Sequence, residues 1–143
     1  MTISSSQILY PLFAMMLLVS VVVTLLWRLR DSAIRNRQVS IKFYRAYVGE
    51  GEPEFHKVVS RHYSNLFEMP VLFYVVVILT YMTQHVTAWM VGCSWVYVVC
   101  RYVHSCVHLT NNNVIVRFAM FLLSALVLLA MWVTLLVMVL NNP

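Results

Sequence analysis

Four apolar blocks separated by polar stretches dominate the pattern along this chain. Their approximate bounds are 8–27, 58–81, 86–109 and 114–140. Each block supplies the roughly 20 apolar residues that a helix needs to cross a bilayer core of about 30 Å. Because the second and third connections are only a few residues long, we expect consecutive helices to pack antiparallel. The pattern therefore predicts an all-α membrane protein, with one domain over 1–143 forming an up-down bundle of four transmembrane helices.

The composition supports a membrane protein. The chain is 62% hydrophobic and 10% charged, whereas soluble domains carry about 25% charged residues. No Lys or Arg precedes Arg28, and the first apolar block exceeds the core of a usual signal peptide, about 7–15 residues. We therefore expect the first block to remain as a span, and little chain is left for a soluble domain.

The positive charge is concentrated in one connection. Eight of the ten basic residues lie between positions 28 and 61, namely Arg28, Arg30, Arg35, Arg37, Lys42, Arg45, Lys57 and Arg61. The positive-inside rule predicts that the loop 28–57 is cytoplasmic and that both termini lie outside. In this loop, residues 49–53 are a predicted tip, and residues 41–48 could lie along the membrane surface. Anionic membrane lipids, and not nucleic acid, are the expected partners of this segment.

Polar residues interrupt three of the apolar blocks at one depth. Arg61, Asn65 and Glu68 have the spacing i, i+4 and i+7, and Arg101, His104 and His108 have the spacing i, i+3 and i+7. Each set therefore forms one stripe on a helix. Arg117 begins the last block. In an up-down bundle all of these residues lie toward the cytoplasmic side, where buried ionisable groups indicate a functional site.

Counting charges in these stripes favours an anion site. A buried Glu68 would require a cation, for which Arg61 and Arg101 are the candidates. Three arginines then face one carboxylate, and the surplus favours an anionic ligand that carries carboxylates. The alternative is a salt-bridge network that only holds the helices together.

Other readings of the polar residues are weaker. His104 and His108 have the i, i+4 spacing of a helical metal site, but the nearby arginines would repel a cation. Three cysteines in one apolar block are typical of packing residues and do not suggest disulfides. His56, His62 and His85 read as interfacial residues without an assigned role.

The ordered motifs resemble the MAPEG family, the membrane-associated proteins in eicosanoid and glutathione metabolism. The second block contains Arg61-His62-Tyr63-Ser64-Asn65-Leu66-Phe67-Glu68, similar to the family's R-x-x-x-N-x-x-E segment. The third contains Arg101-Tyr102-Val103-His104-Ser105-Cys106-Val107-His108, similar to R-x-x-[HY]-x-x-x-Y. Arg117 has the spacing of the family's arginine at the start of span four, and Arg28 resembles the basic end of its first span.

The resemblance implies a homotrimer that binds glutathione between subunits near the cytoplasmic side. The implied binding residues are Arg28, Arg61, Asn65, Glu68, Arg101, His104 and His108. The implied catalytic residue is Arg117, which would stabilise the glutathione thiolate; an adjacent guanidinium lowers a thiol pKa from about 8.5.

This chain also departs from the family pattern, as a divergent, bacterial-type member would. His108 and Phe121 stand where eicosanoid-synthesising members have tyrosines, and Pro70 follows Glu68 more closely than usual. The physiological substrate is therefore not implied.

Two functions are consistent with these features. The first is a glutathione-dependent membrane transferase or peroxidase acting on a lipophilic electrophile that enters from the bilayer. The alternative is a non-catalytic lipid-binding or scaffolding protein on the same fold. A metal or haem site on His104 and His108 is a third reading, which predicts metal in the purified protein.

Overall fold

The computed structural model describes residues 4–46 and 51–141, and these residues form helices joined by short connections. The elements are a 3₁₀ turn η1 (Ser5–Ile8), α1 (Leu9–Arg35), α2 (Ile41–Ala46), α3 (Glu54–Asn65), α4 (Met69–Met82), α5 (Ala88–Leu109) and α6 (Val114–Asn141). Residues 49 and 50 of the predicted loop tip, and residues 47 and 48 of the predicted surface segment, lie outside the described residues. The rest of that surface segment forms the short helix α2.

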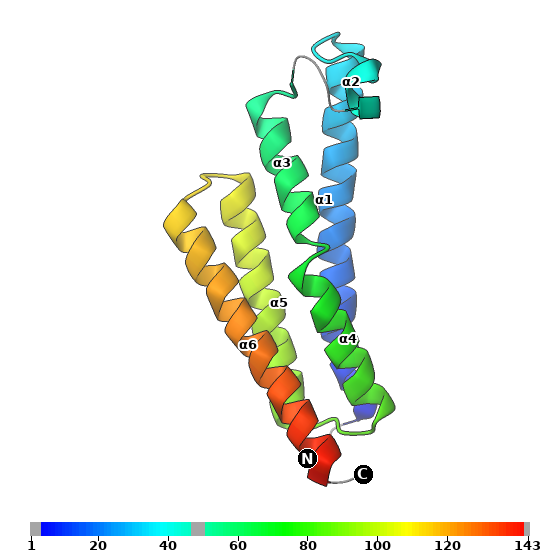
Figure 1. Ribbon diagram of the computed structural model, residues 1–143, viewed down its shortest axis with the longest axis vertical. Helices are drawn as coiled ribbons and strands as arrows, with labels where there is room; N and C mark the ends of the chain where they lie inside the picture. Colours follow the sequence, from blue (N-terminus) through cyan, green and yellow to red (C-terminus); the bar gives the residue numbers. More distant parts are fainter. Residues whose placement is uncertain (1–3, 47–50, 142–143) are drawn as a thin grey trace.

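The chain runs along the bundle four times in alternating directions (Figure 1). One pass is α1, the second combines α3 and α4, and the third and fourth are α5 and α6. The start of α1 and the end of α6 lie at one end of the bundle, and α2 lies at the other. The basic segment therefore lies at the opposite end of the bundle from the start of α1 and the end of α6.

Three helical stretches of the described chain are long and apolar enough to cross a membrane: Ser5–Arg35, Glu54–Met82 and Val114–Asn141. The remaining predicted span, 86–109, corresponds to α5, which is not among them. Its 22 residues are sufficient in length. Arg101, His104 and His108 reduce its apolar character, and all three are buried.

Helix α1 extends well beyond the predicted end of the first span at residue 27. Its last two turns lie beside α3, and Ala33 is fully buried. Arg30 forms an ion pair with the buried Glu52 at 3.3 Å and donates a hydrogen bond to Ser60 at 3.3 Å. The first part of the predicted loop 28–57 is therefore a helical extension of α1 that is held against the segment 52–60 through Arg30.

The second pass is broken between α3 and α4, whereas the apolar pattern predicted one continuous span over 58–81. Residues 66–68 form the break, and Pro70 occupies the first turn of α4. A proline ring clashes with the carbonyl of the residue four positions earlier, here Leu66, and lacks a backbone N–H. The break follows from that clash, and it changes the direction in which Glu68 points relative to Arg61 and Asn65.

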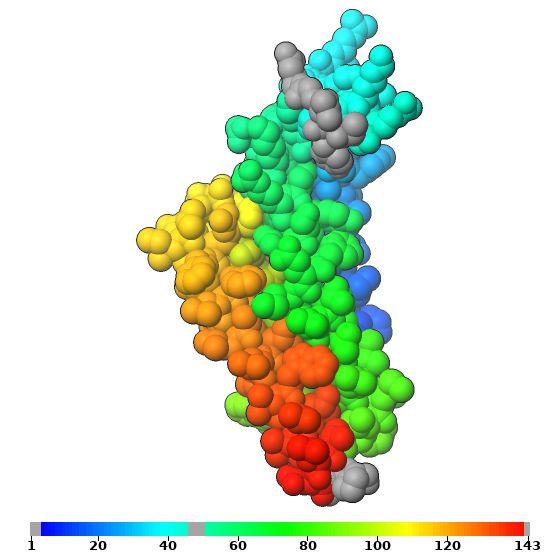
Figure 2. Space-filling model, viewed as in Figure 1, coloured from blue at the N-terminus to red at the C-terminus, as the bar shows by residue number. Residues whose placement is uncertain are grey.

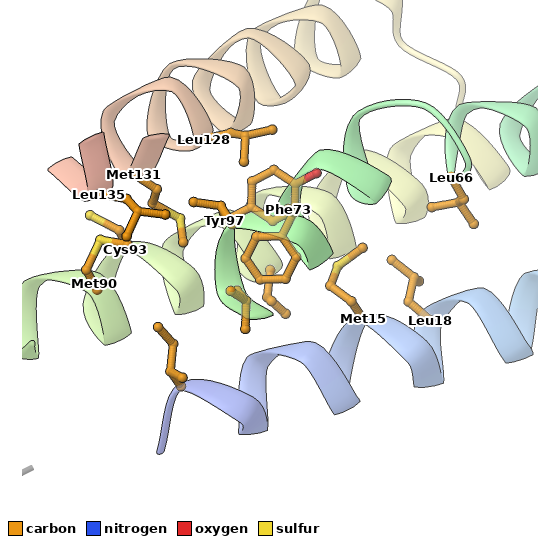
Figure 3. Packing of buried hydrophobic residues seen from close by; sticks show 14 of the residues in the cluster. Met15, Leu18, Leu66, Phe73, Met90, Cys93, Tyr97, Leu128, Met131 and Leu135 are labelled. Atoms are coloured by element: carbon orange, nitrogen blue, oxygen red, sulfur yellow. The ribbon is translucent and has the colours of Figure 1, made fainter. Parts of the chain in front are cut away.

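The apolar core occupies the half of the bundle that contains α4, the first part of α1 and the last part of α6 (Figure 3). Phe73 of α4 stacks on Tyr97 of α5, with ring centroids 4.3 Å apart and planes 10° apart. Met15 of α1 and Met131 of α6 are fully buried in the same cluster. On the outer face, α4 and α6 lie side by side (Figure 2). All four passes thus contribute to one core.

The connection between α5 and α6 is short, as the spacing of the apolar blocks predicted. It covers residues 110–113, and Asn112 has a φ of 50°, a left-handed conformation that asparagine tolerates. The Asn113 side-chain oxygen accepts hydrogen bonds from the backbone N–H groups of Ile115 and Val116 at 3.0 and 3.2 Å. These bonds satisfy free donors at the start of α6, so the turn fixes where Arg117 lies.

Candidate functional site

Five basic side chains from three helices meet on the side of the apolar core that faces α3. We call them the arginine–histidine cluster: His62 of α3, Arg101, His104 and His108 of α5, and Arg117 of α6. The first four are buried and Arg117 is half-buried. The helical spacing predicted the α5 members to share one face, and the structure places that face inward.

Arg101 is the largest fully buried side chain, with none of its surface exposed. Its Nη2 donates a hydrogen bond to the backbone oxygen of Asn65 at 3.3 Å. Its Nε and Nη1 are buried without a hydrogen-bond partner. No carboxylate of the described residues lies within 4.0 Å of this guanidinium. Arg101 therefore retains unused donor capacity and a charge without a close carboxylate partner.

Arg117 holds two histidines of α5 through different atoms. Its backbone oxygen accepts a hydrogen bond from His104 Nδ1 at 3.0 Å. Its Nη1 lies 3.5 Å from His108 Nε2 and also donates a hydrogen bond to the Asn112 side-chain oxygen. The short turn thus brings the arginine that begins α6 against the end of α5.

His62 is a member of the cluster that sequence reasoning missed. It is fully buried, and both of its ring nitrogens lack a hydrogen-bond partner. The signal was present in the spacing, since Val59, His62 and Leu66 recur at helical intervals and all three are buried. The expectation that His62 is an interfacial residue is wrong, because its side chain points away from the polar stripe of Arg61, Asn65 and Glu68 and is buried.

A cavity of about 200 Å³ opens beside the cluster between α3, α5 and α6. Its lining residues are Asn65, His104, Val114, Arg117, Phe118 and Phe121. The Asn65 side chain is half-buried and forms no hydrogen bond to another described residue. A polar amide, an imidazole and a guanidinium therefore face one small cavity that also has an apolar wall, which suits an anionic group attached to an apolar one.

The remaining predicted site residues do not reach this cavity within one chain. Glu68 is exposed in the break between α3 and α4, and no arginine nitrogen lies within 4.0 Å of it. The expectation of a buried Glu68 paired with Arg61 or Arg101 is thus wrong for the single chain, because the helix break turns this carboxylate outward. Glu68 still attracts Arg101 electrostatically at longer range.

Two further predicted residues lie on outer surfaces. Arg61 is exposed beside a separate hollow of about 290 Å³, together with Phe43, Lys57 and Ser60. Arg28 is exposed at the end of a row on α1 that also contains Ser20 and Thr24. Neither arginine contacts the arginine–histidine cluster in one chain, so their predicted roles would require a second copy.

The metal reading finds no support in the geometry. Within residues 4–46 and 51–141, no group of three His, Cys, Asp or Glu side chains is arranged to hold a metal ion. The thiols of Cys93, Cys100 and Cys106 are free, and the first two are buried. The described cluster consists of two arginines and three histidines.

Comparison with known proteins gives one match. Residues 8–137, nearly the whole chain, match the model of a protein family described as the MAPEG family. No curated protein and no solved structure matches the chain.

Proposed function

The chain belongs to the MAPEG family, and from that premise we propose that this integral membrane protein is a glutathione-dependent transferase or peroxidase acting on a lipophilic electrophile. One observation carries the proposal. Arg101 and Arg117 lie among three histidines, and no described carboxylate is within 4.0 Å of either arginine. A ligand that brings its own carboxylates would compensate this charge.

The residues present fit glutathione. Arg101 offers two unused guanidinium nitrogens, and the Asn65 amide and the Arg117 guanidinium face the cavity. In the proposed site, Arg101 and Arg61 compensate the tripeptide's carboxylates, and Glu68 accepts a hydrogen bond from its amino group. Asn65, His104 and His108 complete the polar contacts.

The proposed site requires a second copy of the chain. A cavity of about 200 Å³ is below the range of about 300–1,000 Å³ that is usual for small-molecule sites. Arg61 on α3 and Glu68 in the break after α3 are exposed, and so is the row Ser20, Thr24, Arg28 on α1. If α1 of a neighbouring copy covered the exposed side of α3, Arg28 of that copy would reach the ligand. The polar residues on the exposed sides of α1 and α3 would then be shielded from lipid. We therefore propose a homotrimer, the assembly implied by the family.

Arg117 is the proposed catalytic residue. Glutathione supplies a sulfur nucleophile when its thiol is deprotonated. A guanidinium beside that sulfur favours the thiolate over the thiol. Asn112 and His108 hold the Arg117 guanidinium in place, and Phe118 and Phe121 line the apolar side of the cavity, where a lipophilic substrate would enter from the bilayer.

The proposed orientation follows from charge. We propose four membrane spans, with α5 as the third along the chain, since its length is sufficient and its polar face is turned inward. The basic end at α2 is then cytoplasmic, both termini are outside, and the site lies toward the cytoplasmic side.

The test is a titration of the purified protein with glutathione, read by thermal stability and by thiolate absorbance. We expect a saturable rise in both for the wild type, and loss of the absorbance signal in Arg117→Ala. The matched control is Arg35→Ala, whose side chain is 77% exposed and forms only a local pair with Asp31. The absence of any saturable response, or an equal thiolate signal in Arg117→Ala, would refute the proposal.

A second cavity supports the alternative of non-catalytic lipid binding. It measures about 400 Å³ and is lined by apolar or small residues of α5 and α6: Ala88, Trp89, Gly92, Cys93, Val96 and Val127. A conjugation assay with a generic aromatic electrophile separates the two functions. Binding of amphiphilic ligands without conjugate formation would favour the alternative.

A further inference from the structure

The turn between α5 and α6 contains three consecutive asparagines, and their side chains make different contacts. Asn111 Oδ1 accepts a hydrogen bond from the backbone N–H of Asn113 at 3.2 Å, which closes the turn. Asn113 Oδ1 caps the start of α6. The side chain of Asn112 is half-buried, and its Oδ1 accepts a hydrogen bond from Arg117 Nη1. Asn112 therefore connects the turn to the proposed catalytic residue.

The backbone of Asn112 has an uncommon conformation. Its φ of 50° lies in the left-handed region, which asparagine adopts more readily than most residues that have a side chain. Its N–H donates a hydrogen bond to the backbone oxygen of Val107 in α5 at 2.8 Å. Asn112 is thus bonded through its backbone to α5 and through its side chain to Arg117 of α6.

The groups that anchor the Arg117 guanidinium are neutral. A guanidinium only donates, so Asn112 Oδ1 and His108 Nε2, which lies 3.5 Å from the same Nη1, both act as acceptors. No carboxylate of the described residues lies within 4.0 Å of Arg117. A carboxylate in place of the amide would also hold the guanidinium, but it would compensate the positive charge. The observed anchor fixes the position of Arg117 without doing so.

The anchor occupies only one of the guanidinium nitrogens. Within residues 4–46 and 51–141, neither Nε nor Nη2 of Arg117 forms a hydrogen bond. Arg117 is half-buried and lines the cavity of about 200 Å³ together with Asn65 and His104. Two of its donors therefore remain for a ligand in this cavity, while Nη1 is held by the turn.

We propose that Asn112 is a positioning residue, which holds Arg117 through a neutral amide so that the positive charge remains available to a ligand sulfur. The proposal rests on the proposed function and deepens it, because it states why an amide and not a carboxylate bonds to the catalytic arginine. Asn112 does not line the cavity, so it acts through Arg117. When a bound thiol ionises, its S–H bond breaks, the electron pair stays on sulfur and the proton leaves to solvent. The guanidinium charge then stabilises the thiolate.

The first variant replaces the neutral anchor by a charged one. Asn112→Asp keeps an oxygen acceptor at this position but places a negative charge against Arg117. For bound glutathione, we expect the midpoint of thiolate absorbance against pH to rise by about one unit, a tenfold fall in the ratio of thiolate to thiol. With a generic aromatic electrophile, kcat should fall at neutral pH and recover above the new midpoint, whereas KM for glutathione should change little.

The matched control is Asn111→Asp, because it adds the same charge to the same turn. It also keeps an acceptor for the N–H of Asn113. The side chain of Asn111 is exposed and bonds to the turn, not to Arg117, so the midpoint should stay close to that of the wild type. Equal shifts in the two variants would show that any charge in this turn acts at long range, and would overturn the inference.

A second variant removes the anchor without adding charge. Glycine adopts a left-handed backbone without strain, so Asn112→Gly should keep the turn while it releases Arg117 Nη1. A less ordered guanidinium stabilises the thiolate less well. We expect an upward shift of the midpoint that corresponds to about a threefold fall in the ratio of thiolate to thiol, smaller than in Asn112→Asp. An unchanged midpoint in Asn112→Gly, or a shift in Asn112→Asp that does not exceed it, would overturn the inference.

Binding of S-methylglutathione distinguishes this inference from the proposed function. The analogue has no thiol to ionise, so its affinity should be similar in Asn112→Asp and Asn111→Asp, which also shows that both are folded. If Asn112→Asp does not bind the analogue, the midpoint of Asn112→Gly decides. Thiolate formation in the wild type with unchanged midpoints in the variants would overturn the inference and leave the proposed function intact. The absence of saturable glutathione binding by the wild type would overturn both.

Discussion

The two halves of the bundle differ in whether their buried polar groups have hydrogen-bond partners. Around Phe73 and Tyr97 the buried side chains are apolar, and the buried hydroxyls of Thr80 and Ser94 bond to carbonyls of their own helices at 2.7 and 2.8 Å. Around Arg101 and His62, buried nitrogens remain without partners. Unmade hydrogen bonds of buried groups cost free energy. The first half satisfies most of its buried polar groups in one chain, whereas the second leaves several buried nitrogens without a partner.

Tyr97 marks the boundary between these halves. Its ring stacks on Phe73 in the apolar core, whereas its hydroxyl is buried without a partner. The hydroxyl of Tyr74 is also buried without a partner, and both tyrosines interact electrostatically with Arg101. The ring of Tyr97 therefore belongs to the apolar half, and its hydroxyl belongs to the half in which buried polar atoms lack partners.

The largest effect is expected from breaking the complete half. Phe73→Ala removes a stacked, fully buried ring and leaves a cavity, which should lower the free energy of unfolding by about 3–5 kcal/mol. Thermal unfolding in detergent would show it, with or without ligand. A change below about 1 kcal/mol would show that this half is not closely packed.

Removing the buried cation should have the opposite sign. In Arg101→Met, an apolar side chain replaces a charge that lacks a carboxylate partner, so the ligand-free protein should gain up to about 2 kcal/mol of stability. Stabilisation by added glutathione should disappear in the same variant. A large loss of ligand-free stability would instead identify Arg101 as part of a self-sufficient structural network.

Arg117→Ala should change the pH dependence of glutathione activation. In the proposed site the guanidinium favours the thiolate and so lowers the thiol pKa; its removal should raise that pKa by at least about one unit, a tenfold fall in the ratio of thiolate to thiol. Thiolate absorbance measured against pH would show the midpoint moving upward. An unmoved midpoint would place the sulfur elsewhere in the site.

The smallest effect tests the outer surface of α5. A Cβ added at Gly92 would meet nothing within 4 Å, and alanine is a better helix former by about 1 kcal/mol. Gly92→Ala should therefore stabilise the protein slightly, as read by thermal unfolding. Destabilisation would indicate that another chain packs closely against this glycine.

The sequence was sufficient to predict the helices and much of the polar cluster. The apolar blocks predicted the four passes along the bundle, and the small gap between the last two blocks predicted the short connection before Arg117. The inward direction of Arg101, His104 and His108 followed from their helical spacing. These features depend on local patterns, which one sequence displays directly.

Features that depend on packing between segments were not predicted. The polar extension of α1 is folded because Arg30 pairs with Glu52 and Ser60, which lie more than 20 residues later in the chain. Glu68 points outward because Pro70 breaks a helix that the apolar pattern presented as continuous. His62 was overlooked because its importance comes from rings on another helix.

The break between α3 and α4 also has an electrostatic consequence for Arg101. The carboxyl-terminal end of a helix carries a partial negative charge and the amino-terminal end a partial positive one. Arg101 donates to the backbone oxygen of Asn65, the last residue of α3, and Glu68 lies directly before α4. The partly negative end of α3 therefore faces the positively charged Arg101, and the partly positive end of α4 lies next to the negatively charged Glu68. A continuous helix would present neither end at this depth, and Arg101 would lose that compensation.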